Sequence, residues 1–143
     1  MFRDVVGNEV TLKRAANLPG YEIKLSTSVV IESAVNNPFF KGVNILQLPK
    51  KIKGFRDNSD LNDLLAPKIL ETGIFLSIAD DECAFFVAER SLVSNRKLMN
   101  VKEIFGNKEQ INPMFINFGL KNIKLSAGTV IGTVVIIKTN LKF

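Results

Sequence analysis

The sequence has no histidine, no tryptophan and only one cysteine, Cys83. Without His, the protein lacks the side chain that most often performs acid–base catalysis near neutral pH and most often binds metal ions. A single Cys cannot form an intrachain disulfide, and without His it cannot complete a Cys/His zinc site. The absence of a disulfide framework favours assembly in the cytoplasm.

Long hydrophobic runs are absent as well. No apolar stretch approaches the ~20 residues that a membrane-spanning helix needs. Residues 1–10 carry charged side chains where a signal peptide needs an apolar core. We therefore expect neither a signal peptide nor a membrane among the partners of this protein.

What the chain does contain is the composition of a folded protein, with 46% hydrophobic and 23% charged residues in 143 positions. This length fits one domain, residues 1–143, with a modest core. The net charge of +5 suits weak attraction to nucleic acid, to a phosphate ligand or to an acidic protein. The Lys residues are scattered along the chain, so a solvated basic surface is the simpler interpretation.

Alternating apolar and polar residues predict strands over most of the chain. The stretch from Ile69 to Leu98 organises the pattern: two strand-like runs flank the acidic turn at 80–82, and the second run leads into Arg90 and Ser91. Further strands are expected within residues 1–14, 21–26, 29–31, 114–118, 123–125 and 129–138. About nine short strands separated by Gly, Asn and Pro turns predict an all-β barrel or sandwich.

Glycines mark several of the expected turns. Gly7-Asn8 and Ala127-Gly128 predict tight turns, because Gly and Asn tolerate positive φ. Gly132 interrupts the β-branched run at 129–138 and predicts a bulge or the close approach of a neighbouring segment.

Residues 34–68 differ in composition from the rest of the chain, with Pro and Gly throughout, and predict a long insertion between two strands. Ser59 is a candidate N-cap for a short helix over residues 60–66, the one helix that the pattern predicts. The insertion also carries the densest positive charge of the chain, at Lys50, Lys51, Lys53 and Arg56. Two interpretations of this cluster stay open: a solvated loop, or a contact with a phosphate backbone or an acidic protein.

The order of these segments resembles the trimeric deoxyuridine triphosphatase (dUTPase) and dCTP deaminase superfamily. Residues 20–23, Gly-Tyr-Glu-Ile, follow a basic segment, as the Gly-Tyr-Asp-Leu strand does in the family. Residues 72–74, Thr-Gly-Ile, then precede an acidic turn and the Arg90-Ser91 pair, as in the next family signature. Later, residues 115–119 and 127–132 take the places of the family's Phe-Asn turn and late Gly-containing strand. The resemblance implies a dUTPase-like β-barrel or jelly-roll with the 34–68 insertion, assembled as a homotrimer.

The chain departs from the family where catalysis would need its residues. The dUTPases carry a general-base Asp and a Tyr that packs on deoxyribose in one segment, and residues 101–110 contain neither. Glu103 and Glu109 are the only carboxylates there. In the family a small residue follows the Arg-Ser pair, whereas Leu92 follows it here. Thr133 stands in place of the Gln of the family's late strand, and the family's Gly-rich C-terminal arm is absent. Hydrolysis needs a base within reach of water and a site for the triphosphate and Mg²⁺, so the resemblance implies no catalytic residue here.

Arg90 and Ser91 remain candidates for a vestigial phosphate site, because an Arg and a hydroxyl can bind an oxyanion through charge-assisted hydrogen bonds. The structural alternative pairs Arg90 with Glu22 or Glu89, or places it in a subunit contact.

The leading hypothesis is a non-catalytic structural or interaction protein without a cofactor, on a trimeric scaffold. Such a protein could be a capsid auxiliary or decoration protein of a virus or phage, assembled in the cytoplasm and carried in the virion. One alternative is a divergent dUTP or dCTP hydrolase or deaminase that uses Mg²⁺, with Glu103 or Glu109 as the base. Another is a basic nucleic-acid-binding β-barrel, which would lack the usual aromatic stacking platform.

Overall fold

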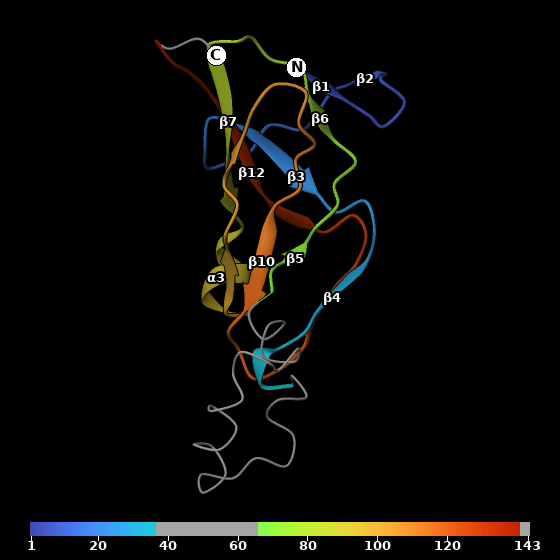
Figure 1. Ribbon diagram of the computed structural model, residues 1–143, viewed down its shortest axis with the longest axis vertical. Coiled ribbons are helices and arrows are strands. Elements are labelled where there is room, and N and C mark those ends of the chain that lie inside the picture. Colours follow the sequence, from blue (N-terminus) through green and yellow to red (C-terminus); the bar gives the residue numbers. More distant parts are fainter. Residues whose placement is uncertain (37–65, 141–143) are drawn as a thin grey trace, which may run out of the picture.

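The structure of the protein, a computed structural model, describes residues 1–36 and 66–140 (Figure 1). The cluster of Lys50, Lys51, Lys53 and Arg56 and nearly all of the helix predicted over 60–66 lie outside the described residues. Within the described ranges, no helix is long and apolar enough to span a membrane.

Strands dominate the described residues and pair in four antiparallel sheets. The largest sheet has the order β3 (Tyr21–Lys24), β12 (Val130–Lys138), β7 (Glu82–Ala88) and β9 (Ile104–Phe105). A three-stranded sheet has the order β5 (Lys68–Ile69), β10 (Met114–Asn117) and β8 (Leu98–Asn100). A second has the order β2 (Glu9–Val10), β1 (Phe2–Arg3) and β6 (Phe75–Leu76), and β11 (Ile123–Leu125) pairs with β4 (Val29–Ile31). The strand orders of the described part do not close on themselves, so the all-β prediction is confirmed in its open, jelly-roll-like form.

The hydrophobic core is shared by all four sheets, and the β7-containing and β10-containing sheets meet within it. The rings of Phe86 on β7 and Phe115 on β10 meet edge to face, with centroids 6.3 Å apart. Both side chains are buried, as are Ala84 on β7 and Val134 on β12. Since successive residues of a strand point to opposite faces, the neighbours of these residues point away from the core.

Strand β12 holds the largest sheet together because it pairs with β7 from Gly132–Ala88 to Lys138–Glu82 and with β3 on its other side. The pairing with β3 shifts register between Val130 and Gly132. A Cβ atom on Gly132 would come within 2.7 Å of Phe86 Cε2 and still closer to the carbonyl oxygen of Val87. The predicted bulge and close approach at this glycine are both confirmed.

The predicted tight turns are confirmed by backbone geometry. Gly7 has φ +92° in the hairpin between β1 and β2, and Gly128 has φ +87° before β12. The acidic turn at 80–82 leads into β7, and Glu82 Oε1 accepts a hydrogen bond from the Ala79 N–H at 2.8 Å.

Some local features differ from the sequence expectation. The strand-like run before the acidic turn, residues 74–78, forms only the two-residue strand β6, Phe75–Leu76, in which Leu76 is buried. Beyond β7 the chain forms a helix, α3 (Arg90–Ser94), where no helix was predicted. A 3-10 turn, η1 (Ala34–Asn36), follows β4 at the start of the predicted insertion.

Strand β10 buries a polar residue that the sequence pattern did not single out. Phe115 and Asn117 point into the core, so Met114 and Ile116 lie on the outer face. The Asn117 amide donates to the carbonyl oxygens of Ile31 at 2.9 Å and Lys121 at 2.8 Å, and its Oδ1 accepts from the Gly119 N–H at 2.8 Å. These three bonds tie β10 to β4 and to the turn after β10.

Candidate functional site

The Arg-Ser pair opens helix α3, which lies at the end of β7 remote from the N-terminal hairpin (Figure 1). The Glu89 N–H still bonds to the Ile131 carbonyl at 2.8 Å, so the ladder with β12 extends to the residue before the helix. Leu92 is buried and anchors the five-residue helix to the core. Leu92 therefore packs against the core, at a position where the family that this chain resembles has a small residue.

The side chains of Arg90 and Ser91 are exposed. Their carbonyl oxygens serve the helix: Arg90 O accepts from Ser94 Oγ at 2.8 Å, and Ser91 O accepts from the Asn95 N–H at 3.1 Å. The ion pairs of the described residues join Lys13 to Glu22, Lys102 to Glu109 and Lys138 to Asp81. Arg90 pairs with neither Glu22 nor Glu89 among the described residues, so a subunit contact is the part of the structural alternative that stays a prediction. Glu22 pairs with Lys13, whose carbonyl oxygen also accepts the Glu22 N–H at 2.8 Å.

The two carboxylates of residues 101–110 are in different situations. Glu109 Oε2 lies 3.3 Å from Lys102 Nζ, and its Oε1 accepts a hydrogen bond from the Gly106 N–H at 3.0 Å. Lys102 Nζ also lies 5.0 Å from the centre of the ring of Phe105, which is fully buried. Glu103 is exposed, and its carbonyl oxygen accepts the Phe86 N–H at 2.7 Å. Only Glu103 has an uncommitted carboxylate.

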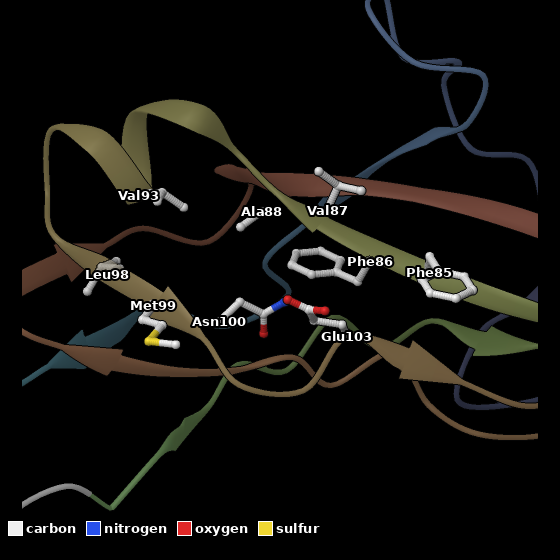
Figure 2. A pocket seen from close by; sticks show the side chains of 9 residues that line it. All are labelled: Phe85, Phe86, Val87, Ala88, Val93, Leu98, Met99, Asn100 and Glu103. Atoms are coloured by element: carbon white, nitrogen blue, oxygen red, sulfur yellow. The ribbon is translucent and has the colours of Figure 1, made fainter.

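A groove of about 410 Å³ lies between the end of β7, helix α3 and β8 (Figure 2). Its lining is mostly apolar: Phe85, Phe86, Val87, Ala88, Val93, Leu98 and Met99, with Asn100 and Glu103 as the polar members. Figure 2 shows Phe86 pointing from β7 toward β8, whereas Val87 and Met99 point to opposite sides of the groove. Since neither Lys nor Arg lines it, the groove suits apolar contact better than phosphate binding.

A second hollow, of about 380 Å³, lies beside the acidic turn and is lined by Ala79, Asp80, Glu82, Gly106, Asn107, Lys108 and Glu109. Three of its five polar side chains accept hydrogen bonds from backbone N–H groups. Glu82 and Glu109 accept the N–H groups named above, and Asn107 Oδ1 accepts the Ile78 N–H at 2.9 Å. These contacts hold two turns together, so the hollow is a product of turn structure.

No group of three or more His, Cys, Asp or Glu side chains that could hold a metal ion occurs in residues 1–36 and 66–140. The basic cluster of the insertion lies outside these ranges, so the structure does not place it near the groove or near Arg90. The apolar groove is the feature that sequence reasoning missed. Its signal was the run from Ala84 to Ala88, which is apolar on both faces of the strand.

Comparisons with known proteins identify the fold. The chain is similar in structure to the dUTPase of Streptococcus mutans, with 14% identity, a TM-score of 0.64 and coverage of 98% of this chain and 96% of that one. It is also similar to EIAV dUTPase (13%, TM-score 0.62, 97% and 88%) and to a mutant dUTPase of Staphylococcus bacteriophage 80alpha with dUpNHpp (12%, TM-score 0.64, 96% and 81%). No family model and no curated protein sequence matches the chain. The chain thus has the dUTPase-like all-β fold, in a strongly divergent sequence, and the predicted resemblance is confirmed for the fold.

Proposed function

We propose that this protein is a non-catalytic homotrimeric scaffold that binds another protein. The observation that carries the proposal is the state of the carboxylates in residues 101–110. Glu109 is held by Lys102 and by the Gly106 N–H, which leaves Glu103 as the one uncommitted carboxylate of the segment.

The surroundings of Glu103 do not suit a general base for a triphosphate. It lines a groove without Lys or Arg, and hydrolysis requires both a base near the attacking water and cationic groups on the phosphates. Arg90 and Ser91, the two oxyanion-binding candidates, are exposed residues of helix α3 and do not line the groove, to which this helix contributes Val93. We therefore propose that neither Mg²⁺ nor another cofactor takes part in its function.

Turnover measurements test this part of the proposal. Incubation with dUTP or with dCTP in the presence of Mg²⁺ is expected to release pyrophosphate and ammonia only at the buffer rate. The dUTPase of phage 80alpha, assayed in parallel with dUTP, shows that the conditions support hydrolysis. If the wild type turns over either nucleotide and a Glu103→Gln variant does not, while the matched control Glu109→Gln does, the non-catalytic proposal is wrong and the protein is a divergent enzyme.

The homotrimer is the form of assembly that the resemblance implies. Its test is the mass in solution, expected to be about 48 kDa for three copies of the 15.9 kDa chain. A mass that stays at one chain at micromolar concentration removes the trimer.

For the partner we propose the surface of a virus particle. The support is that dUTPases of the staphylococcal phages 80alpha and phi11 have this fold, so phage genomes carry it. Mass spectrometry of purified particles from the source virus is expected to find the protein at a fixed ratio to the major shell protein. Particles that lack it, from cells that make it, exclude this setting.

A further inference from the structure

Three large apolar side chains lie exposed where the turn after β10 meets η1, at the end of the molecule opposite the N-terminal hairpin (Figure 1). Phe118 and Leu120, in the turn between β10 and β11, have exposed fractions of 55% and 80%. Val35 of η1 lies close to this turn, because Ser33 Oγ accepts the Val35 N–H at 3.3 Å and donates to the Gly119 carbonyl oxygen. Val35 is also exposed, and we call Val35, Phe118 and Leu120 the apolar tip.

Polar groups outside the apolar tip fix the backbone of this turn. The Asn117 side chain bonds to three backbone groups in and around it, as described above. The Phe118 N–H donates to the Lys97 carbonyl at 3.0 Å, and Asn122 Oδ1 accepts the Ser33 N–H at 2.9 Å. None of these bonds uses a side chain of the apolar tip, so the tip is presented to solvent on a turn that other residues hold. A contact surface that is ordered before binding loses less conformational entropy when it binds.

Basic residues predominate in the segments that meet at the apolar tip. Residues 30–36, 94–98 and 117–124 contain Arg96, Lys97, Lys121 and Lys124 but only one acidic residue, Glu32. All five are exposed, and the ion pairs of the described residues involve none of them. Arg96 and Lys97 run directly beside the turn, since a Cβ atom on Gly119 would lie 3.4 Å from Lys97 Cβ and 3.6 Å from the Arg96 carbonyl oxygen. The apolar tip therefore lies in positively charged surroundings.

This combination favours a protein partner that offers carboxylates around an apolar centre, because protein interfaces pair an apolar centre with opposite charges around it. A second copy of the chain would bring the same basic residues to the contact, so two tips repel each other. Residues 37–65, which continue the chain from η1, hold five basic and three acidic residues and so provide no excess of negative charge. A nucleic acid is disfavoured because Leu120 and Val35 have no ring on which a base could stack.

The apolar tip has the size of the centre of an interface. Three side chains about half exposed or more present on the order of 250 Å² of mostly apolar surface. A standard interface buries roughly 800 Å² per partner, so the basic surroundings would supply the rest of the contact. Aromatic residues and Arg are enriched in interfaces, and the tip combines Phe118 with the neighbouring Arg96.

We propose that the apolar tip is the docking site for an acidic segment of a partner protein. The partner places apolar side chains against Phe118 and Leu120 and carboxylates beside Arg96 and Lys121. This inference rests on the protein-binding part of the proposed function, and it names the surface of this chain and the chemistry of the partner.

A library of short random peptides supplies the probe, and peptides are selected on the immobilised full chain. The selected peptides are expected to combine Asp or Glu with aromatic or aliphatic residues. One of them, synthesised and labelled, is then titrated with the wild type and with variants whose β fold circular dichroism has verified. Leu120→Ser and Lys121→Glu are each expected to weaken its binding by about tenfold or more, because each removes one half of the recognition.

Two controls match these variants. Val6→Ser changes an apolar residue of the N-terminal hairpin that is 79% exposed, and Lys24→Glu makes the same charge change on β3, in a different sheet. Both controls are expected to bind the peptide within about twofold of wild type, since charges beyond about 8 Å are largely screened at 0.15 M salt. In NMR spectra of the wild type, the peptide is expected to shift the amide signals of residues 96–97 and 117–122.

The outcomes separate this inference from the proposed function. Selected peptides without acidic residues, peptides that bind Leu120→Ser as tightly as Val6→Ser, or a selection without binders overturn the docking site and leave the non-catalytic scaffold to its own tests. Turnover of dUTP by a wild type that binds the peptide as expected removes the non-catalytic scaffold and keeps the docking site. If Leu120→Ser loses the β fold, Val35→Ser replaces it.

The same variants test the other occupants of the tip. Phosphatidylserine vesicles or single-stranded DNA that bind the wild type but not Leu120→Ser, where acidic peptides do not bind, would assign the tip to a membrane or to a nucleic acid and overturn the protein partner. A sedimentation mass that falls in Leu120→Ser but not in Val6→Ser would assign it to a second copy and overturn the inference as well.

Discussion

The strand pairing at Gly132 gives the sharpest test of the packing of this fold. In a Gly132→Ala variant, the new methyl group would lie within 2.7 Å of Phe86 Cε2 and closer still to the Val87 carbonyl oxygen. The carbonyl belongs to β7, and β7 pairs with β12 along its whole length, so it cannot turn aside. The two strands must therefore separate locally, and the Phe86 ring must leave its contact with Phe115.

Overpacking of a core by one or two carbon atoms destabilises proteins by about 1–3 kcal/mol. A Gly-to-Ala change also restricts the unfolded chain, which offsets about 0.4–1 kcal/mol. We expect a net loss of about 2 kcal/mol, toward the upper part of the range because the obstacle is backbone. With an unfolding entropy of about 2.1 cal/mol/K per residue, 143 residues give a fall in Tm of about 7 °C.

Urea and thermal unfolding at one fixed protein concentration measure this loss, since association shifts both transitions. The matched control is Gly106→Ala, where the new methyl group would meet only the end of the Glu109 side chain at 3.4 Å. Gly106→Ala is expected to change stability by less than about 0.5 kcal/mol. If Gly132→Ala unfolds at the same urea concentration as the control, the close approach of β12 to β7 is refuted.

Three further substitutions test individual contacts by the same unfolding measurement. Asn117→Ala leaves the buried Ile31 carbonyl, the part-buried Lys121 carbonyl and the Gly119 N–H without this partner and is expected to cost about 2–3 kcal/mol. The exposed Asn140→Ala should cost under about 0.5 kcal/mol, and equal losses would contradict the network. Leu92→Ala removes the buried anchor of α3 and is expected to cost about 2–4 kcal/mol, whereas a loss below about 1 kcal/mol would mean that the helix is not anchored there. Arg90→Ala is expected to stay within about 0.5 kcal/mol of wild type, because its exposed side chain forms none of the described ion pairs; a larger loss would indicate a structural partner.

Sequence reasoning correctly placed the strands whose side-chain pattern is compatible with only one orientation of the strand in the sheet. Strand β3 alternates buried Ile23 with outward Glu22 and Lys24, so its inner face follows from polarity alone. Strand β12 is β-branched over most of its length, and Gly132 marks a position where the backbone of β7 passes close. In both cases local preference and tertiary packing agree.

Other features depend on contacts that no local pattern encodes. Helix α3 has five residues, too few to show the periodicity that identifies a helix, and it forms because Leu92 reaches the core after β7 ends. In β10 both faces read as apolar, so the inward position of Asn117 depends on carbonyl groups supplied by β4 and the following turn.

In the candidate site, too, the sequence identified residues but not the contacts that they form. The sequence singled out Arg90, Ser91 and the two carboxylates of residues 101–110, but it could not show that Lys102 and the Gly106 N–H bind Glu109 or that Glu22 pairs with Lys13. These contacts join residues through turns and neighbouring strands. Their partners become known only when the strand register is known.

The apolar groove follows from a property of β7 that the sequence did contain. A strand that is apolar on both faces is typical of a sheet covered on both sides. In this sandwich Ala84 and Phe86 are buried in the core, whereas Phe85 is half-buried and Val87 is 44% exposed on the opposite face. Because these outward positions are apolar too, the alternation that identifies a half-buried strand is missing from β7. The sequence therefore could not show which face of β7 would be buried, and the groove beside this strand became visible only in the structure.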